Sequence, residues 1–216
     1  MSVELETPHG PARAHLHPAA EPVAALVLGH GANGGVGAPD LVAVTQAAGA
    51  AGLSVALVEQ PYRVAERRSP APAHQLDEAW EAVLEQLRAD ALDGLDVIVG
   101  GRSSGARVAC RTADSVGAAA VLCLAFPLHP PGKADDPSKS RLGELEAVAV
   151  PVLIVQGERD PFGMPPAGPG REVVRVPGNH SLRSTAAVAA AVSEWLASGV
   201  HPIATARSGH GNTAAQ

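Results

Sequence analysis

Three separate segments carry a serine, an aspartate and a histidine, the residue types of a nucleophile, an orienting acid and a base. Residues 101–105 read "GRSSG", a G-x-S-x-G pattern centred on Ser103, while Asp160 stands in "GERDPFG" and His180 in "PGNHSLR". An imidazole accepts the proton of a serine hydroxyl, and a carboxylate orients that imidazole and stabilises its charged form. The chemistry that such a set performs is acyl transfer through an acyl-enzyme.

Alternating strands and helices must bring these three segments together. Near-continuous apolar runs predict strands that are buried on both faces. They cover residues 23–28, 53–58, 96–100, 119–126, 151–157 and 172–178. Helical spacing and start signals predict the helices between them. The helices cover residues 39–52, 74–90, 104–116 and 181–198, with a shorter one near 141–148, and residues 2–17 read as an opening hairpin.

This order predicts one α/β domain with a mostly parallel central sheet between two helix layers. Such sheets bind ligands at the carboxyl ends of their strands. Ser103, Asp160 and His180 each follow the end of a predicted strand. We therefore expect all three at the same edge of the sheet.

The glycine-rich turn "LVLGHGANGG", residues 26–35, has two interpretations. Residues 29–34 match the G-x-G-x-x-G pattern of a dinucleotide site, and Glu59 stands where a ribose-binding acid would lie. In such a site a helix follows at once, whereas here the predicted helix waits until Pro39. The favoured alternative is that the glycines free backbone amides to bind an oxyanion.

From about residue 22 to residue 198 the sequence resembles an α/β-hydrolase. The segments that carry the resemblance are "LVLGHGANG", "GGRSSGAR", "FPLHPPGK", "LIVQGERDPFG" and "PGNHS". They are similar to the small, lidless, dienelactone-hydrolase-like branch. In particular they resemble the hydrolase-like domain of a subunit of the chromatin-associated NSL complex and the testis-expressed hydrolase-like proteins.

The resemblance implies an α/β-hydrolase fold, a three-layer sandwich without a large cap domain. It implies that Ser103 is the nucleophile, His180 the base and Asp160 the acid, in the chain order of this fold. It also makes the glycine-rich turn the oxyanion loop, with the backbone amides of Ala32 and Ser104 as the expected donors. One such donor stabilises the transition state by about 3–4 kcal/mol.

Each of the three residues also has a purely structural interpretation. Ser103 is a suitable N-cap for the helix that follows it. Asp160 is suited to an Asx turn before a proline, in which case Glu158 is the next candidate for the acid. His180 would then be an ordinary turn residue. Chance explains poorly why three strand-end loops deliver three chemically matched residues.

Four residues are candidates for the rim of the substrate site: His30, Asn33, Arg63 and His129. For His30 and Asn33 the favoured roles are positioning the loop and forming its turn. Arg63 belongs to an arginine-rich segment, 59–72, which holds an anionic substrate in one interpretation and is a solvated loop in the commoner one. His129 lies where many hydrolases insert a lid, but its segment is too short for a helical cap.

The composition limits the class of protein. Of 216 residues, 46% are hydrophobic, which suffices for a sizeable core, and we expect one domain over residues 1–200. Residues 201–216 are small and polar, so we expect them to be disordered. The net charge of −6 disfavours nucleic-acid or membrane partners. Without a secretory leader or a membrane-spanning run, the expected location is the cytoplasm.

Cysteine and histidine usage excludes further site classes. Cys110 and Cys123 stand in apolar surroundings without a C-x-x-C pair, which predicts free buried thiols. The remaining histidines lack ligand spacing, so we expect no metal and no cofactor.

The sequence leaves three function hypotheses. The leading one is a serine hydrolase, of carboxylesterase or thioesterase type, that acts on a small acyl substrate as a monomer or homodimer. The second is a hydrolase-fold interaction module with little or no turnover. The third is a nucleotide-binding protein that uses the glycine-rich turn.

Overall fold

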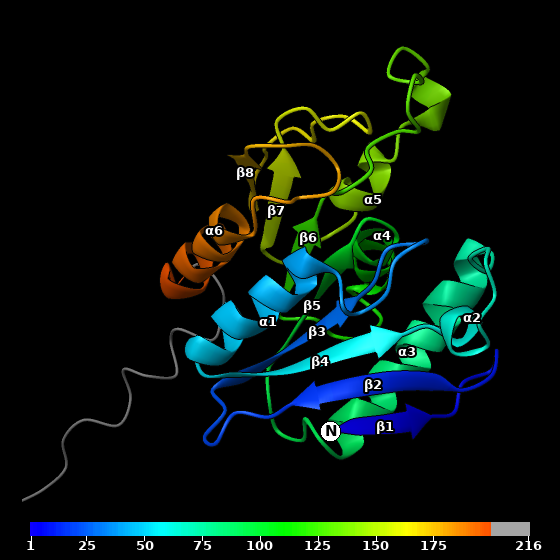
Figure 1. The fold of residues 1–216 in the computed structure, drawn as a ribbon, viewed down its shortest axis with the longest axis vertical. Coiled ribbons are helices and arrows are strands. Elements are labelled where there is room, and N and C mark those ends of the chain that lie inside the picture. Colours follow the sequence, from blue (N-terminus) through cyan, green and yellow to red (C-terminus); the bar gives the residue numbers. More distant parts are fainter. Residues whose placement is uncertain (200–216) are drawn as a thin grey trace, which may run out of the picture.

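A single eight-stranded sheet forms the centre of the molecule (Figure 1). The computed structural model describes residues 1–199. The strands are β1 (Ser2–Leu5), β2 (Ala12–His17), β3 (Ala24–Gly29), β4 (Leu53–Glu59), β5 (Val97–Arg102), β6 (Ala120–Leu124), β7 (Val152–Gly157) and β8 (Arg171–Val176). Their order in the sheet is β1-β2-β4-β3-β5-β6-β7-β8. The strands β1 and β2 pair antiparallel, and β2 joins β4 antiparallel, whereas all other pairs are parallel.

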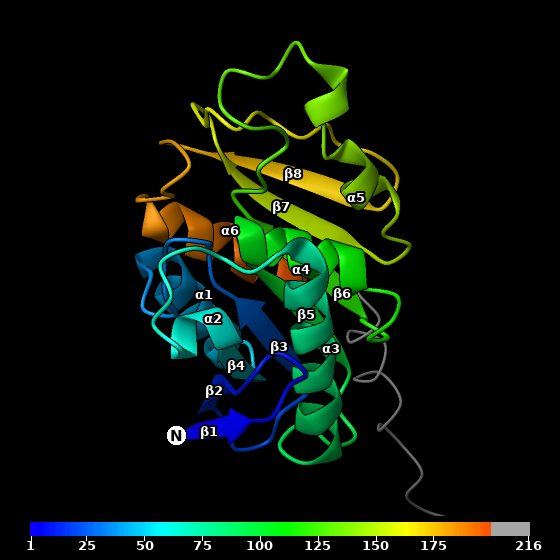
Figure 2. The same cartoon turned by 90° about the vertical axis from the view of Figure 1, so that its right-hand side faces the viewer.

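Helices cover both faces of this sheet. They are α1 (Pro39–Ala50), α2 (Pro61–Val64), α3 (Ala73–Ala89), α4 (Ser104–Thr112), α5 (Leu142–Glu146) and α6 (Thr185–Ala197), with a 3-10 helix at Pro137–Lys139. Helices α1 and α6 pack together on one face, and α3, α4 and α5 lie on the other (Figure 2). The predicted three-layer α/β-hydrolase fold without a large cap domain is confirmed.

Two apolar cores lie between the sheet and its helix layers. Trp80 of α3 and Phe126, just after β6, are fully buried in one core, and Leu41 of α1 and Trp195 of α6 are buried in the other. Because the inner strands β3 to β7 contribute side chains to both cores, they read as nearly unbroken apolar runs, whereas the edge strand β8 does not. This burial explains why the predicted bounds of these strands lie close to the observed ones.

The helices differ from the sequence-based expectation in three main places. Helix α4 ends at Thr112 rather than at residue 116. Helix α6 begins at Thr185 rather than at residue 181 because Leu182 has a φ of +45°, which a right-handed helix excludes. The short helix α2 was not predicted; its four residues are too few to show a helical period.

The tail expected to be disordered, 201–216, lies outside the described residues. Among residues 1–199, no helix is long and apolar enough to cross a membrane.

Three backbones meet at the carboxyl edge of the sheet, where β3, β5 and the start of α4 come together. A Cβ on Gly101 would lie 2.5 Å from the carbonyl oxygen of Gly29, and a Cβ on Gly105 would lie at the same distance from that oxygen. Real side chains do not tolerate such a contact with backbone atoms. The two glycines of G-x-S-x-G are therefore required by close packing.

The close approach at Gly105 predicts that one added methyl group destabilises the protein there but not at an open glycine position. Gly105→Ala should lower the free energy of unfolding by about 3 kcal/mol, because neither the strand nor the helix backbone has room to move. The matched control is Gly49→Ala in α1, whose Cβ would meet nothing within 4 Å. This control should leave stability unchanged or raise it by about 1 kcal/mol. Equal urea midpoints for both variants would contradict the packing argument.

Candidate active site

Ser103 stands on a sharp turn between β5 and α4. Its φ is +53° and its ψ is −105°, a strained conformation for a residue with a side chain. Its backbone N–H donates to the carbonyl of Leu124 at 2.9 Å, which ties the turn to the end of β6. The side chain makes no capping hydrogen bond to α4. The N-cap interpretation of its hydroxyl is therefore wrong.

The hydroxyl of Ser103 meets His180 instead. His180 Nε2 lies 2.9 Å from Ser103 Oγ, and His180 Nδ1 lies 2.8 Å from Asp160 Oδ2. With the proton on Nδ1, the imidazole donates to the carboxylate and its Nε2 accepts from the serine hydroxyl. The three residues predicted from strand-end loops thus form one continuous hydrogen-bonded chain. Glu158, the alternative acid, is exposed and makes no contact with His180 in the described contacts.

The carboxylate of Asp160 is held from several sides. Its side chain is 0% exposed. Oδ1 accepts from the backbone N–H of Phe162 at 2.9 Å, and Oδ2 accepts from Gln156 Nε2 at 2.9 Å as well as from His180. The Asx turn and the acid role are therefore compatible, because each uses a different oxygen. Gln156, which is buried in β7, was not identified from the sequence. The available signal was a single polar residue at the end of an apolar run.

A buried ion pair holds the loop that carries His180. Arg102 Nε donates to Asp40 Oδ2 at 2.8 Å, and Arg102 Nη2 donates to the backbone carbonyl of His180 at 2.9 Å. Asp40, in the first turn of α1, is 1% exposed. Burial raises the pKa of Asp40, while the charge of Arg102 opposes that shift. Arg102 was not predicted, since an arginine at the variable position of G-x-S-x-G carries no local signal.

His30 lies inside the glycine-rich loop after β3 and not on the rim of the cavity that holds Ser103, which corrects one of the rim candidates. It is 3% exposed. Its Nδ1–H donates to the carbonyl of Gly31 at 2.8 Å, and its Nε2 accepts from the N–H of Gln60 at 3.2 Å. Both ring nitrogens are occupied, so the side chain positions the loop. Burial lowers the pKa of His30 below its ordinary value of 6.5, which keeps the ring neutral.

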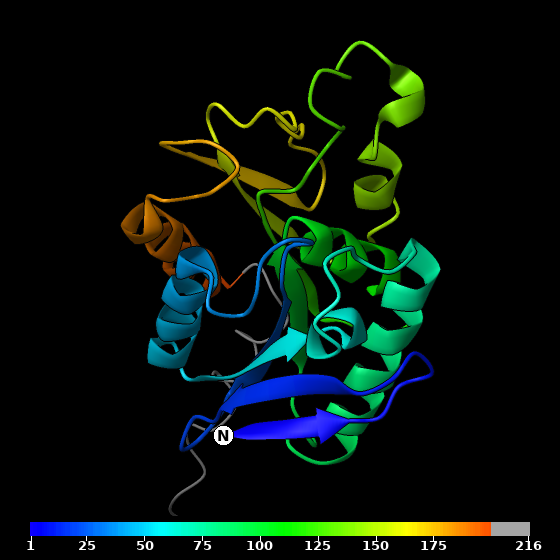
Figure 3. The ribbon, with the colours of Figure 1, turned by 45° about the vertical axis from the view of Figure 1, so that its right-hand side comes forward.

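A second hydrogen bond fixes the same loop from α2. The hydroxyl of Tyr62 donates to the carbonyl of Ala32 at 2.9 Å. Burial raises the pKa of Tyr62 to about 12, so its hydroxyl remains protonated. Figure 3 shows the loop after β3 and the segment of α2 lying next to each other.

The other three rim candidates also lie outside the cavity that holds Ser103. Asn33 is exposed in a turn closed by a bond from Gly34 N to Gly31 O, as its favoured interpretation required. Arg63 belongs to α2. His129 hydrogen-bonds to its neighbour Pro130 and packs against the loop that follows Asp160.

The dinucleotide interpretation of the glycine-rich turn finds no support. Helix α1 begins only at Pro39, so no helix N-terminus follows the glycines directly. Glu59 pairs with His15 at 2.9 Å and with Arg13 at 3.8 Å, contacts that stabilise β2 against β4. It is therefore a structural acid between strands.

Ser103 opens into a cavity of about 250 Å³. Ala32 and Ser104, the expected oxyanion residues, line it together with Ser103, and Phe162 forms another part of its wall. The Phe162 ring lies 4.1 Å from the His180 ring, measured between centroids. The full lining is Ala32, Pro70, Ala71, Ala73, Leu76, Ser103, Ser104, Arg107, Arg111, Pro127, Arg141 and Phe162.

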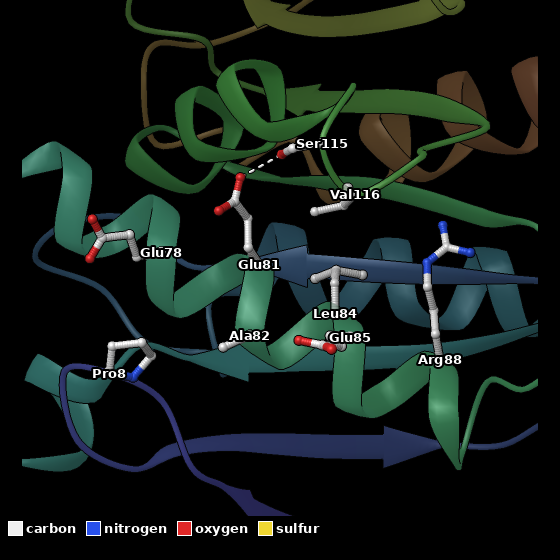
Figure 4. Close-up of a pocket in the computed structure, with 9 residues that line it drawn as sticks. All are labelled: Pro8, Glu78, Glu81, Ala82, Leu84, Glu85, Arg88, Ser115 and Val116. Carbon is white, nitrogen blue, oxygen red and sulfur yellow. Dashed lines mark hydrogen bonds between the residues drawn. The ribbon is translucent and has the colours of Figure 1, made fainter.

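A second, larger hollow of about 530 Å³ lies along α3 (Figure 4). Its acidic wall is formed by Glu78, Glu81 and Glu85, and Ser115 Oγ donates to Glu81 there. It contains none of the three residues of the Ser103 hydrogen-bonded chain. Its serine hydroxyl bonds to a carboxylate, but no histidine is among the lining residues to act as base between them, so the hollow is a poorer candidate for chemistry despite its size.

The cysteines are not alternative nucleophiles. Cys110 and Cys123 are free and buried, as predicted, with their sulfur atoms 3.5 Å apart. The hydrogen bond between Cys123 and Cys110, and next burial, raise the pKa of Cys123. Within residues 1–199 there is no cluster of three potential metal ligands.

This fold and this serine-histidine-aspartate arrangement define the α/β-hydrolase class. Residues 22–210 match the family model described as an alpha/beta hydrolase domain, and the chain belongs to that family. No curated protein matches the sequence.

Solved structures agree with this assignment at the level of the fold. An α/β serine hydrolase without a lid from Xanthomonas campestris is 18% identical, with a TM-score of 0.69, and the match covers 92% of this chain and 95% of that one. A serine hydrolase homologue from Coxiella burnetii is 18% identical, with a TM-score of 0.72 over 91% and 97%. A dienelactone hydrolase from Anabaena variabilis is 18% identical, with a TM-score of 0.69 over 90% and 95%.

The lowered pKa of His30 predicts a pH-dependent contribution to stability. Its unfolded state takes up a proton at a higher pH than its folded state does. The stabilisation by neutral His30 is therefore complete above pH 6.5 and is lost as the pH falls toward its folded pKa. Urea unfolding at about pH 7.5 and about pH 5.5 measures this difference.

Two variants test the assignment to this residue. His30→Gln should lose part of the stability difference between the two pH values, because it removes the buried titrating group. His17→Gln, at an exposed position at the end of β2, should keep the wild-type difference. An undiminished difference in His30→Gln would show that other groups cause it.

Proposed function

We propose that this protein is a serine hydrolase that cleaves ester or thioester bonds of small acyl substrates through an acyl-enzyme. The observation that carries the proposal is the hydrogen-bonded chain from Ser103 through His180 to the buried carboxylate of Asp160, open to a cavity. A structural role would not require a strained serine whose hydroxyl is bonded to an imidazole. Strain of this kind is concentrated at functional sites.

In the first step, Ser103 Oγ attacks the carbonyl carbon of the substrate. His180 Nε2 takes the hydroxyl proton as the new C–O bond forms, and the imidazolium is stabilised by Asp160. The same proton then passes to the leaving alcohol or thiol as the C–O or C–S bond breaks. The tight hold on Asp160 keeps the imidazole in the tautomer that this step requires.

The negative charge of the tetrahedral intermediate needs hydrogen-bond donors. Ser104 is the first residue of α4, so its N–H has no partner within the helix and lies at the positive end of the helix dipole. Ala32 lines the same cavity, and its loop is held by His30 and Tyr62. The two amides form the proposed oxyanion hole.

In the second step, water replaces the leaving group. His180 removes a proton from the water, hydroxide attacks the acyl carbon, and the proton returns to Ser103 Oγ as the acid is released. The cavity volume of about 250 Å³ is below the usual range for drug-sized ligands, which favours a short acyl group.

Covalent labelling tests the nucleophile. The wild-type protein should react with a fluorophosphonate probe, and Ser103→Ala should abolish the labelling because the attacking oxygen is removed. The matched control is Ser115→Ala, which lies beyond the opposite end of α4. Intact labelling of Ser103→Ala would overturn the assignment. Absence of Ser103-dependent turnover across a screen of short esters would favour the interaction-module hypothesis.

Asp160 and Glu158 lie two residues apart, so a variant of each tests whether activity needs the carboxylate next to His180 or only a negative charge in this loop. Asp160→Asn should lower kcat by about 10⁴-fold, because the amide cannot stabilise the imidazolium and favours the wrong tautomer. Glu158→Gln removes the same charge from an exposed position and should retain activity. Steady-state kinetics on a short ester measure both. Equal losses in the two variants would contradict the proposed role of Asp160.

A further inference from the structure

Three arginines form one wall of the cavity that holds Ser103. They are Arg107 and Arg111, one turn apart on α4, and Arg141, immediately before α5. None of them belongs to the arginine-rich segment 59–72 that the sequence suggested for anion binding. Tertiary structure brings this positive charge to the cavity from two distant parts of the chain.

Two of these arginines are already paired. Arg107 donates to both carboxylate oxygens of Glu144, at 2.9 Å and 2.5 Å. Arg111 donates to both oxygens of Asp77, at 2.8 Å and 2.6 Å. Such two-point pairs fix the guanidinium groups and balance their charge.

Arg141 is not paired in this way. The one described hydrogen bond of its side chain runs from Nη1 to the backbone carbonyl of Pro127 at 2.9 Å. No ion pair joins it to any carboxylate in the described part of the chain. Burial, and next the repulsion of Arg107, lower the pKa of Arg141, and the attraction of Glu144 offsets these effects only in part.

The charge balance of the wall follows from these contacts. The wall carries three guanidinium groups, and the carboxylates of Glu144 and Asp77 pair with two of them, which leaves one positive charge uncompensated. A half-buried guanidinium with free N–H donors binds a carboxylate through two parallel hydrogen bonds. A single negative charge of the ligand would neutralise the wall.

We propose that Arg141 binds a carboxylate group of the substrate, so that the preferred substrates are short esters or thioesters that carry one negative charge. The proposal rests on the proposed function, because it places the scissile carbonyl at Ser103 in the same cavity. Arg141 thereby sets specificity, and its guanidinium binds a group distant from the reacting atoms.

Two matched substrate pairs test this preference and locate the charge. For a charge on the acyl side, mono-4-nitrophenyl glutarate is compared with the neutral 4-nitrophenyl 5-methylhexanoate, which has the same shape. For a charge on the leaving group, 4-(butyryloxy)benzoate is compared with 4-acetylphenyl butyrate. The wild-type ratio of kcat/KM, charged over neutral, should exceed that of Arg141→Gln by about tenfold to a hundredfold in one of the pairs.

A control variant with the same change in net charge separates binding at Arg141 from the electrostatic effect of the whole protein. Arg175→Gln removes one positive charge from an exposed position on β8 and should keep the wild-type ratio in both pairs. Arg141→Lys should restore part of the lost ratio, because it keeps the charge but not the two-point geometry. Ratios that are unchanged in Arg141→Gln for both pairs would overturn the proposal.

Ligand binding distinguishes failure of this proposal from failure of the proposed function. Glutarate, a dicarboxylate that needs no turnover, should bind the wild-type protein in a calorimetric titration and bind Arg141→Gln at least about tenfold more weakly. Esterase activity without a charge preference and without glutarate binding would reject the Arg141 site alone. Glutarate binding that depends on Arg141 but comes without ester turnover would reject the proposed function alone.

Discussion

The backbones of β3, β5 and α4 approach each other at Gly29, Gly101 and Gly105 more closely than side chains allow. This contact forces the chain to reverse sharply between β5 and α4, which leaves Ser103 with a positive φ. The same contact brings the glycine-rich loop after β3 next to the N-terminus of α4. The proposed nucleophile and two candidate amide donors are therefore positioned by one packing constraint, before any side-chain hydrogen bond is considered.

Polar side-chain contacts position the two loops that backbone packing alone does not, those of His180 and Asp160. Arg102 links Asp40 of α1 to the carbonyl of His180, and Gln156 of β7 holds the carboxylate of Asp160. These groups lie where an unpaired charge or amide would cost free energy, so each requires its partner in place. The loops that carry His180 and Asp160 are thereby held in place.

Much of the fold was predictable, because its signals are local. Strands buried on both faces need unbroken apolar runs, and α3 carries its buried residues at helical spacing. The predictions were wrong where a single residue or a short segment decides the outcome. Leu182, with its positive φ, delays the start of α6, and the four residues of α2 are too few for a period.

Within the candidate site, too, some features were predictable from the sequence and others were not. The sequence by itself determined the order and loop positions of Ser103, Asp160 and His180, since each follows a strand whose carboxyl end must lie at one edge of a parallel sheet. Only the tertiary structure decided that His30 faces inward. It alone brought Arg141, from the connection between β6 and β7, to the same cavity as Ser103. The physical reason is that strand direction follows from local patterns, whereas the partner of a long polar side chain depends on segments that meet only when the chain has folded.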